Sequence, residues 1–183
     1  MLTIFKENPL KPISLIHSLF INNKFDDDIF SSIILFISQY HSFTSFDNIL
    51  VDILKSTKSL TIKENNIIFQ SLVMHNLNNS ASYLLKYKGV DPSLNNNFAL
   101  LTACANGNTT LVELLLSHNL MFPAIFNFNP LKVAYLNHRN DICHLLYQRE
   151  DIKSLLAQMP LEEQNKALNA ISIHNTQLNV SGF

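Results

Sequence analysis

Glycine is scarce in this sequence of 183 residues, in which it occurs three times, and proline occurs six times. Tight β-turns depend on these two residue types, so a fold built from many β-hairpins is disfavoured. Two cysteines are too few for a disulfide framework, which indicates a reducing compartment. These shortages favour a helical protein of the cell interior.

Charge is also low, and long apolar runs are missing. Charged residues make up 15% of the chain and the net charge is −1, so there is no electrostatic footprint for nucleic acid or an acidic membrane. The longest apolar stretch, Ile29 to Ile37, is interrupted by serines. It is shorter than the roughly 18 apolar residues of a membrane helix. Lys6, Glu7 and Pro9 interrupt any apolar signal region. We expect no nucleic-acid partner, no membrane insertion and no targeting segment.

What the sequence has is apolar spacing typical of short helices. Thr61 and Glu64 fit the capping-box pattern, in which each side chain satisfies a backbone amide of the other residue. A helix is predicted from there to about Asn76. Asparagine pairs and triplets separate the apolar segments, as expected of turn residues that tolerate a left-handed backbone. The pattern predicts stacked helical hairpins.

A repeat of 31 residues runs through the second half of the chain. It relates Leu100 to Leu131 and Ala103 to Ala134. The same offset in the other direction leads from Ala103 to Leu72. Small alanines at an equivalent position indicate close helix packing, which leaves no room for a larger side chain.

These units resemble the ankyrin repeat. Ala99-Leu100, Ala103, Gly107 and then Leu111 through Leu116 follow the order of the family's signature, and Pro130-Leu131 opens a further copy. The resemblance covers about residues 65–151 and implies a tight turn, two antiparallel helices and a loop in each unit. It predicts an all-α, ankyrin-like helical repeat solenoid with extra N-terminal helical pairs and a C-terminal capping helix.

Several positions depart from the family's pattern. Gly107 is expected to end its helix with a positive φ, and the equivalent residues are Asn76 and His138; asparagine and histidine are among the few other residues enriched in that conformation. The closing loop Asn119 to Phe128 contains Pro123 in place of the family's loop sequence. We therefore expect this loop to have a different geometry.

No catalytic or metal-binding constellation emerges from the sequence. Cys104 and Cys143 occupy apolar positions of the repeat and are predicted to be small buried hydrophobes. No two of the seven histidines lie three or four residues apart, the spacing that would suggest zinc ligands on one helix. We expect no cofactor, no metal and no enzymatic activity.

The resemblance also implies where a partner would bind. In ankyrin-like units, contacts come from the tip before the first helix and from the two residues before its terminal glycine. Three of the nine equivalent residues are large and apolar, which marks either an interaction surface or a site covered by the irregular third unit or by flanking helices. The nine are Asn66, Met74, His75, Asn97, Ala105, Asn106, Phe128, Leu136 and Asn137.

The sequence divides into residues 1–60 (N-terminal helical pairs, with a divergent repeat or a cap as alternatives), 61–153 (ankyrin-like repeats) and 154–183 (C-terminal cap and tail). Within the last segment, Ser154 to Ile173 should form capping helices, and Asn175 to Phe183 should be a tail.

The predicted function is a non-enzymatic module that binds a protein through the concave face of the ankyrin-like repeats. It would act as an adaptor, inhibitor or targeting device in the cytoplasm, or in a host cytosol if the chain is a secreted effector. One alternative is a substrate-positioning region of a larger enzyme or effector. The other is a small enzyme whose site is assembled across repeats.

Overall fold

A computed structural model describes residues 33–34, 37–38, 41–42, 46–57, 60–118 and 130–180. These residues contain helices and no strands, so the predicted all-α repeat class is confirmed. The chain divides into two compact units, Met1–Val90 and Asp91–Phe183. The first contains α3 (Phe46–Ser56), α4 (Ile62–Met74) and α5 (Asn78–Tyr87). The second contains α6 (Leu94–Asn106), α7 (Thr109–Leu116), α8 (Pro130–Leu136), α9 (Asn140–Tyr147), α10 (Glu150–Ala157) and α11 (Leu161–Val180).

The capping box predicted at the start of α4 is confirmed. The amide of Glu64 donates to the Thr61 hydroxyl at 3.2 Å, and the amide of Thr61 donates to the Glu64 carboxylate at 2.7 Å. The Thr61 hydroxyl also donates to the Glu64 carboxylate at 2.7 Å. This bond, and then the bond from the Thr61 amide, hold the pKa of the Glu64 carboxyl below its usual value. Two amides that the helix leaves without an internal acceptor are thus satisfied.

Each helix pair is joined by the same turn, with a residue of left-handed backbone after the first helix. The three residues are Asn76 (φ 56°), Gly107 (φ 75°) and His138 (φ 57°). The next amide after each one donates back to a carbonyl five residues earlier, in three equivalent bonds: Leu77 to Leu72 at 2.9 Å, Asn108 to Ala103 at 3.0 Å and Arg139 to Ala134 at 2.9 Å. This bond is the signature of a Schellman helix end. The 31-residue register and the predicted positive φ values are confirmed.

Left-handed residues also occur at the start of α6. Asn95, Asn96 and Asn97 have φ values of 54°, 58° and 61°, so the regular right-handed helix begins after them. Asparagine adopts this conformation at lower cost than most residues, because its short polar side chain bonds to nearby backbone.

Buried core residues recur at the same 31-residue interval as the turns. Equivalent residues on the first and second helices of each pair are at most 1% exposed, which is why the apolar spacing recurs at a fixed interval. These residues are Phe69, Leu100 and Leu131; Leu72, Ala103 and Ala134; Ala81, Val112 and Cys143; and Leu84, Leu115 and Leu146.

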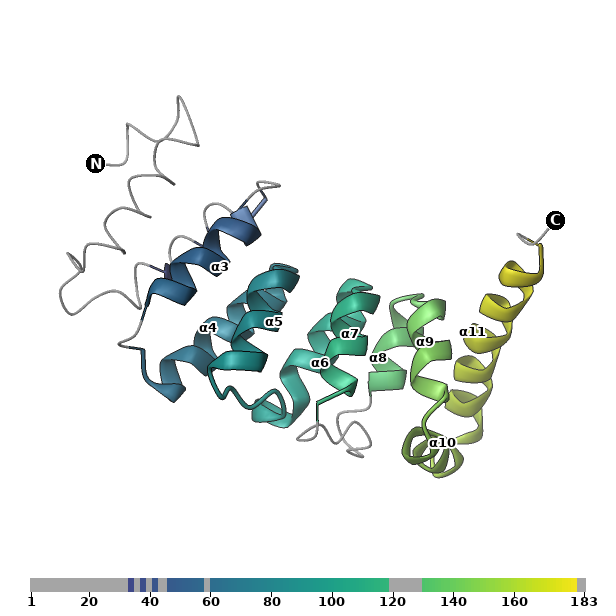
Figure 1. The fold of residues 1–183 in the computed structure, drawn as a ribbon. Coiled ribbons are helices and arrows are strands. Elements are labelled where there is room, and N and C mark those ends of the chain that lie inside the picture. Colours follow the sequence, from purple (N-terminus) through teal and green to yellow (C-terminus); the bar gives the residue numbers. More distant parts are fainter. Residues whose placement is uncertain are drawn as a thin grey trace. The chain divides into compact units, whose positions relative to one another are not determined.

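In the first unit, α5 packs against both α3 and α4 (Figure 1). The carboxylate of Asp47, in the first turn of α3, accepts hydrogen bonds from the amides of Asn79 at 2.8 Å and Ser80 at 2.9 Å. At the other end, the Lys88 ammonium donates to the Thr57 carbonyl at 2.9 Å. Both ends of α5 are therefore tied to α3 and the residue that follows it.

In the second unit, α6 packs on α7 and α8, α8 on α9, and α11 lies against α8 and α9 (Figure 1). The Thr109 hydroxyl, at the start of α7, donates to the Asp141 carboxylate of α9 at 2.6 Å. The expectation of a non-helical tail after Asn175 is wrong, because α11 continues as a helix to Val180.

Some predictions fall outside the described residues. These include the irregular loop Asn119 to Phe128 and most of the N-terminal helical pairs, of which α3 is described. The three-segment division of the chain remains a prediction. Among the residues that the structure does describe, no helix combines the length and apolar character needed to span a membrane.

Candidate functional site

The predicted partner-binding residues of the first unit lie on α4 and at its end. Met74 is 54% exposed, while Asn66 and His75 are half-buried. The His75 ring stacks on the His41 ring with centroids 4.1 Å apart. Burial lowers the pKa of His75 from its ordinary value of 6.5, and the charge of the neighbouring His41 lowers it further to a smaller extent. Met74 is therefore the most accessible of the three.

Asn97 is a correction to the predicted set. It is fully buried, at 0% exposed, and is the last of the three left-handed residues that open α6. A side chain with no accessible surface cannot contact a partner in this conformation, so the tip position does not serve as a contact in the second repeat.

At the end of α6, Asn106 is exposed and Ala105 is half-buried. The Ala105 carbonyl accepts a hydrogen bond from Arg139 Nε at 3.2 Å. The same arginine lies across Gly107, where an added Cβ would be 2.9 Å from Nε. Glycine at this point thus serves both the positive φ and the close approach of the Arg139 side chain.

At the end of α8, Leu136 is 58% exposed and Asn137 is also exposed. The Asn137 side chain donates to the carbonyl of Val133 on its own helix at 2.8 Å. Phe128, the remaining predicted contact, lies outside the described residues. We call the two residues before each left-handed position the helix-end residues: Met74 and His75, Ala105 and Asn106, Leu136 and Asn137.

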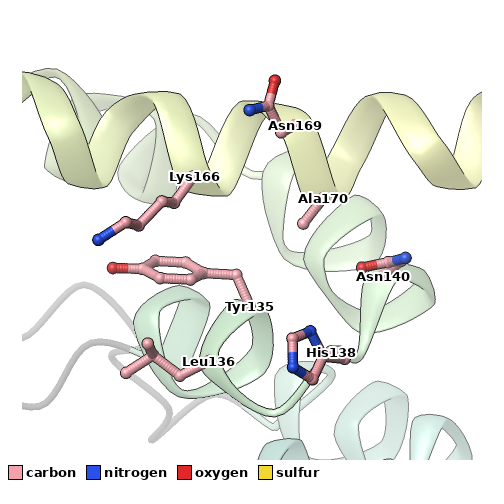
Figure 2. A pocket seen from close by; sticks show the side chains of 7 residues that line it. All are labelled: Tyr135, Leu136, His138, Asn140, Lys166, Asn169 and Ala170. Atoms are coloured by element: carbon pink, nitrogen blue, oxygen red, sulfur yellow. The ribbon is translucent and has the colours of Figure 1, made fainter.

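Sequence reasoning missed a pocket of about 510 Å³ in the second unit. Figure 2 shows it between α11 and the turn that joins α8 to α9. Only Leu136 among its lining residues was predicted as a contact, because the family pattern directs attention to the first helix of each pair. The alternation of apolar and polar residues on α11 predicted that this helix packs as a cap. It did not predict the pocket that forms beside the exposed edge of α11. The lining residues are Tyr135, Leu136, His138, Asn140, Lys166, Asn169 and Ala170.

The two cysteines are buried, as predicted, at 0% exposed. Burial, with the nearby Asp141 carboxylate, raises the pKa of Cys143 to about 12, and burial likewise raises the pKa of Cys104. A thiol with so high a pKa is a poor nucleophile at neutral pH, because the thiolate is the reactive form. No group of three or more His, Cys, Asp or Glu side chains within the described ranges could hold a metal ion.

The geometry alone defines the class of the protein. It is a helical repeat protein in which each repeat is an antiparallel helix pair joined by the same left-handed turn. A family model described as ankyrin repeats, in three copies, matches residues 61–155, and the chain belongs to the ankyrin repeat family. Ankyrin repeats are in general protein–protein interaction modules. Among curated proteins and solved structures, none matches the chain.

Proposed function

We propose that this chain is a non-enzymatic protein-binding module, an adaptor, inhibitor or targeting device, that holds its partner through the helix-end residues. One observation carries the proposal: Met74 and Leu136, at equivalent positions two repeats apart, are 54% and 58% exposed. Exposing a large apolar side chain twice at the same point of a repeat costs solvation free energy each time. A partner that covers such a side chain recovers that cost.

The neighbouring helix-end residues support this function. Asn106 and Asn137 are exposed amides beside the apolar positions, and polar groups at the rim of an apolar contact provide orientation and specificity. The two free, buried thiols agree with a cytosolic location, which is part of the proposal.

The test is to compare two surface variants of α4 as bait for binding proteins. Met74→Asp places a charge at the proposed contact, and Ile62→Asp places the same charge at a residue that is 65% exposed at the other end of the helix. Proteins cross-linked and captured by the wild-type chain should be retained by Ile62→Asp and lost by Met74→Asp, with circular dichroism showing both variants folded. Equal capture by Met74→Asp and the wild type would contradict the proposal.

A further inference from the structure

The chain contains two arginines, Arg139 and Arg149, and each stands immediately before a helix. Arg139 is the N-cap residue of α9, Arg149 is that of α10, and neither side chain caps its helix. A cation is disfavoured at this point, because the helix dipole places partial positive charge at the N-terminus. In the preceding repeat the residue equivalent to Arg139 is Asn108, whose side chain accepts a hydrogen bond from the Leu111 amide at 3.1 Å. Helix stability alone would therefore favour asparagine over arginine.

The two arginines differ in how their charge is balanced. Arg149 donates from Nε and Nη2 to the two oxygens of the Asp151 carboxylate, both at 3.0 Å. Arg139 forms no ion pair with any residue that the structure describes. Its side chain donates from Nε to the Ala105 carbonyl at 3.2 Å. The N–H groups on its two terminal nitrogens therefore have no acceptor among the described residues.

The Arg139 side chain is nevertheless held in one place. It is half-buried, and its Nε, Cδ and Cζ atoms lie over Gly107, at 2.9, 3.0 and 3.0 Å from the point where a Cβ would be. The hydrogen bond to the Ala105 carbonyl restrains it further. An arginine that is already restricted loses less conformational entropy on binding a ligand than a fully mobile one. The guanidinium is therefore preorganised beside the helix-end residues of α6.

The surroundings of this guanidinium favour one negative charge. The helix-end residues of α6 and α8 are uncharged. The nearest carboxylate along the chain, that of Asp141, accepts a hydrogen bond from the Thr109 hydroxyl at 2.6 Å and forms no ion pair with Arg139. One guanidinium balances one carboxylate and can hold it through two parallel hydrogen bonds. A phosphate monoester carries about two negative charges and is usually bound by several arginines.

We propose that Arg139 binds an aspartate or glutamate side chain of the protein partner, next to the part of the partner that covers the helix-end residues. The partner's carboxylate pairs with the guanidinium of Arg139 as the Asp151 carboxylate pairs with Arg149. This role accounts for an arginine at a position where helix stability disfavours one, since departures from local stability rules concentrate at functional sites. The inference rests on the proposed protein-binding function and specifies the charge of one partner residue.

The first test observes the two arginine Nε–Hε signals of the full wild-type chain by ¹H–¹⁵N NMR. N-acetyl-aspartic acid N-methylamide, added at constant ionic strength, should shift the Arg139 signal and leave the Arg149 signal in place, because Asp151 already occupies that guanidinium. The asparaginyl counterpart, which lacks the charge, should bind at least about fivefold more weakly, the ratio that corresponds to about 1 kcal/mol. Equal shifts of both signals, or no shift of the Arg139 signal, would overturn the proposal.

The second test compares Arg139→Asn with Arg149→Asn as bait for a displayed library of random peptides that have no free carboxyl end. Peptides selected by the wild type and by Arg149→Asn should be enriched in Asp and Glu, and this enrichment should be absent with Arg139→Asn. Because asparagine can cap α9, Arg139→Asn should keep at least the wild-type unfolding midpoint, which a purely structural arginine would not allow. Equal acidic enrichment with Arg139→Asn and the wild type would overturn the proposal. If Arg139→Asn does not fold, the NMR experiment on the wild type decides.

Failure of this proposal is distinguishable from failure of the proposed function. If the Arg139 signal does not respond to the acidic probe, but partner capture still depends on Met74 and not on Ile62, the protein-binding function stands and Arg139 is not its acidic contact. If Arg139 selects acidic peptides as expected while Met74→Asp captures the same proteins as the wild type, the Arg139 contact stands and the helix-end contact at Met74 is wrong.

Discussion

The first repeat, α4 and α5, and the third, α8 and α9, make the same turn with different residues. Leu72 and Asn76 in the first correspond to Ala134 and His138 in the third, yet the carbonyls of Leu72 and Ala134 accept the same hydrogen bond at 2.9 Å. Backbone hydrogen bonding therefore fixes the turn, and several side chains satisfy it. The core position is different, because a leucine and an alanine fill different volumes against different neighbours.

The largest effect is expected from a substitution that tests whether the first repeat needs the large side chain of Leu72. Leu72→Ala removes a fully buried side chain, at 0% exposed, and leaves a cavity, so the free energy of unfolding should fall by about 2–5 kcal/mol. Urea unfolding followed by circular dichroism measures this loss. Leu72→Met, which conserves volume, should cost less than about 1.5 kcal/mol. A loss below that value for the alanine variant would mean that the site collapses around the smaller side chain.

The reverse substitution tests the third repeat. Ala134 is fully buried on α8, which packs against α6, α9 and α11. Ala134→Leu should therefore destabilise the second unit by about 1–3 kcal/mol through overpacking. Ala157→Leu, on the exposed side of α10, introduces the same side chain without that crowding. An unfolding midpoint equal to that of the wild type for Ala134→Leu would show that the third repeat has room for the leucine of the first.

These contrasts show what the sequence could predict. The register followed from Leu100 and Ala103 recurring as Leu131 and Ala134, because buried positions tolerate few residue types and so repeat visibly. The turns followed from Gly107, since a glycine after a helical pattern indicates a left-handed helix end. Local signals of this kind depend on neighbouring residues alone.

Two of the failures have local causes, and the third depends on contacts between segments that are distant in sequence. Asn97 was predicted at an exposed tip, but it is fully buried and ends a run of three left-handed residues. The pocket needs Lys166 and Ala170 of α11 beside His138, and nothing in either segment alone specifies how the final helix docks. The helix through Asn175 to Val180 was missed because its apolar period fades, whereas an established helix extends at little cost per residue.

A smaller effect is expected where the turns differ in their left-handed residue. Gly107→Ala should destabilise by about 1–2 kcal/mol, the usual cost of a left-handed conformation for a residue with a Cβ. The added Cβ also meets the Arg139 side chain at 2.9 Å. Repeating the substitution in an Arg139→Ala background separates backbone strain from the clash. Asn76→Gly should leave stability unchanged or raise it, and a clear loss there would mean that the Asn76 side chain itself supports the first turn.

The hydrogen bonds that join α3 to α5 should contribute about 1 kcal/mol each. Asp47→Ala removes the carboxylate that accepts two amides at the start of α5, a loss comparable to that of a helix N-cap. Faster hydrogen exchange is expected across Asn78–Tyr87. Asp52→Ala, which breaks an exposed pair with Lys55 on the same helix, is the control. Similar exchange in both variants would show that α5 does not depend on Asp47.

The smallest expected effect is a pH dependence confined to the first unit. Because burial and His41 lower the pKa of His75 below 6.5 in the folded chain, the unfolded chain binds this proton at higher pH than the folded chain does. As the pH falls from about 7 to about 5, the proton therefore favours the unfolded state and stability decreases. The position of His75 at the end of α4 opposes this effect in part, since a helix C-terminus favours positive charge.

Urea midpoints measured across this pH range should fall less steeply for His75→Gln than for the wild type. His118→Gln, in the second unit, controls for the loss of one histidine elsewhere in the chain. Exchange rates in α4, corrected for the intrinsic effect of pH, should show the same difference and locate it in the first unit. If His75→Gln retained the whole pH dependence, another group would be responsible, and the stacked histidine pair would have no measurable influence on the first repeat.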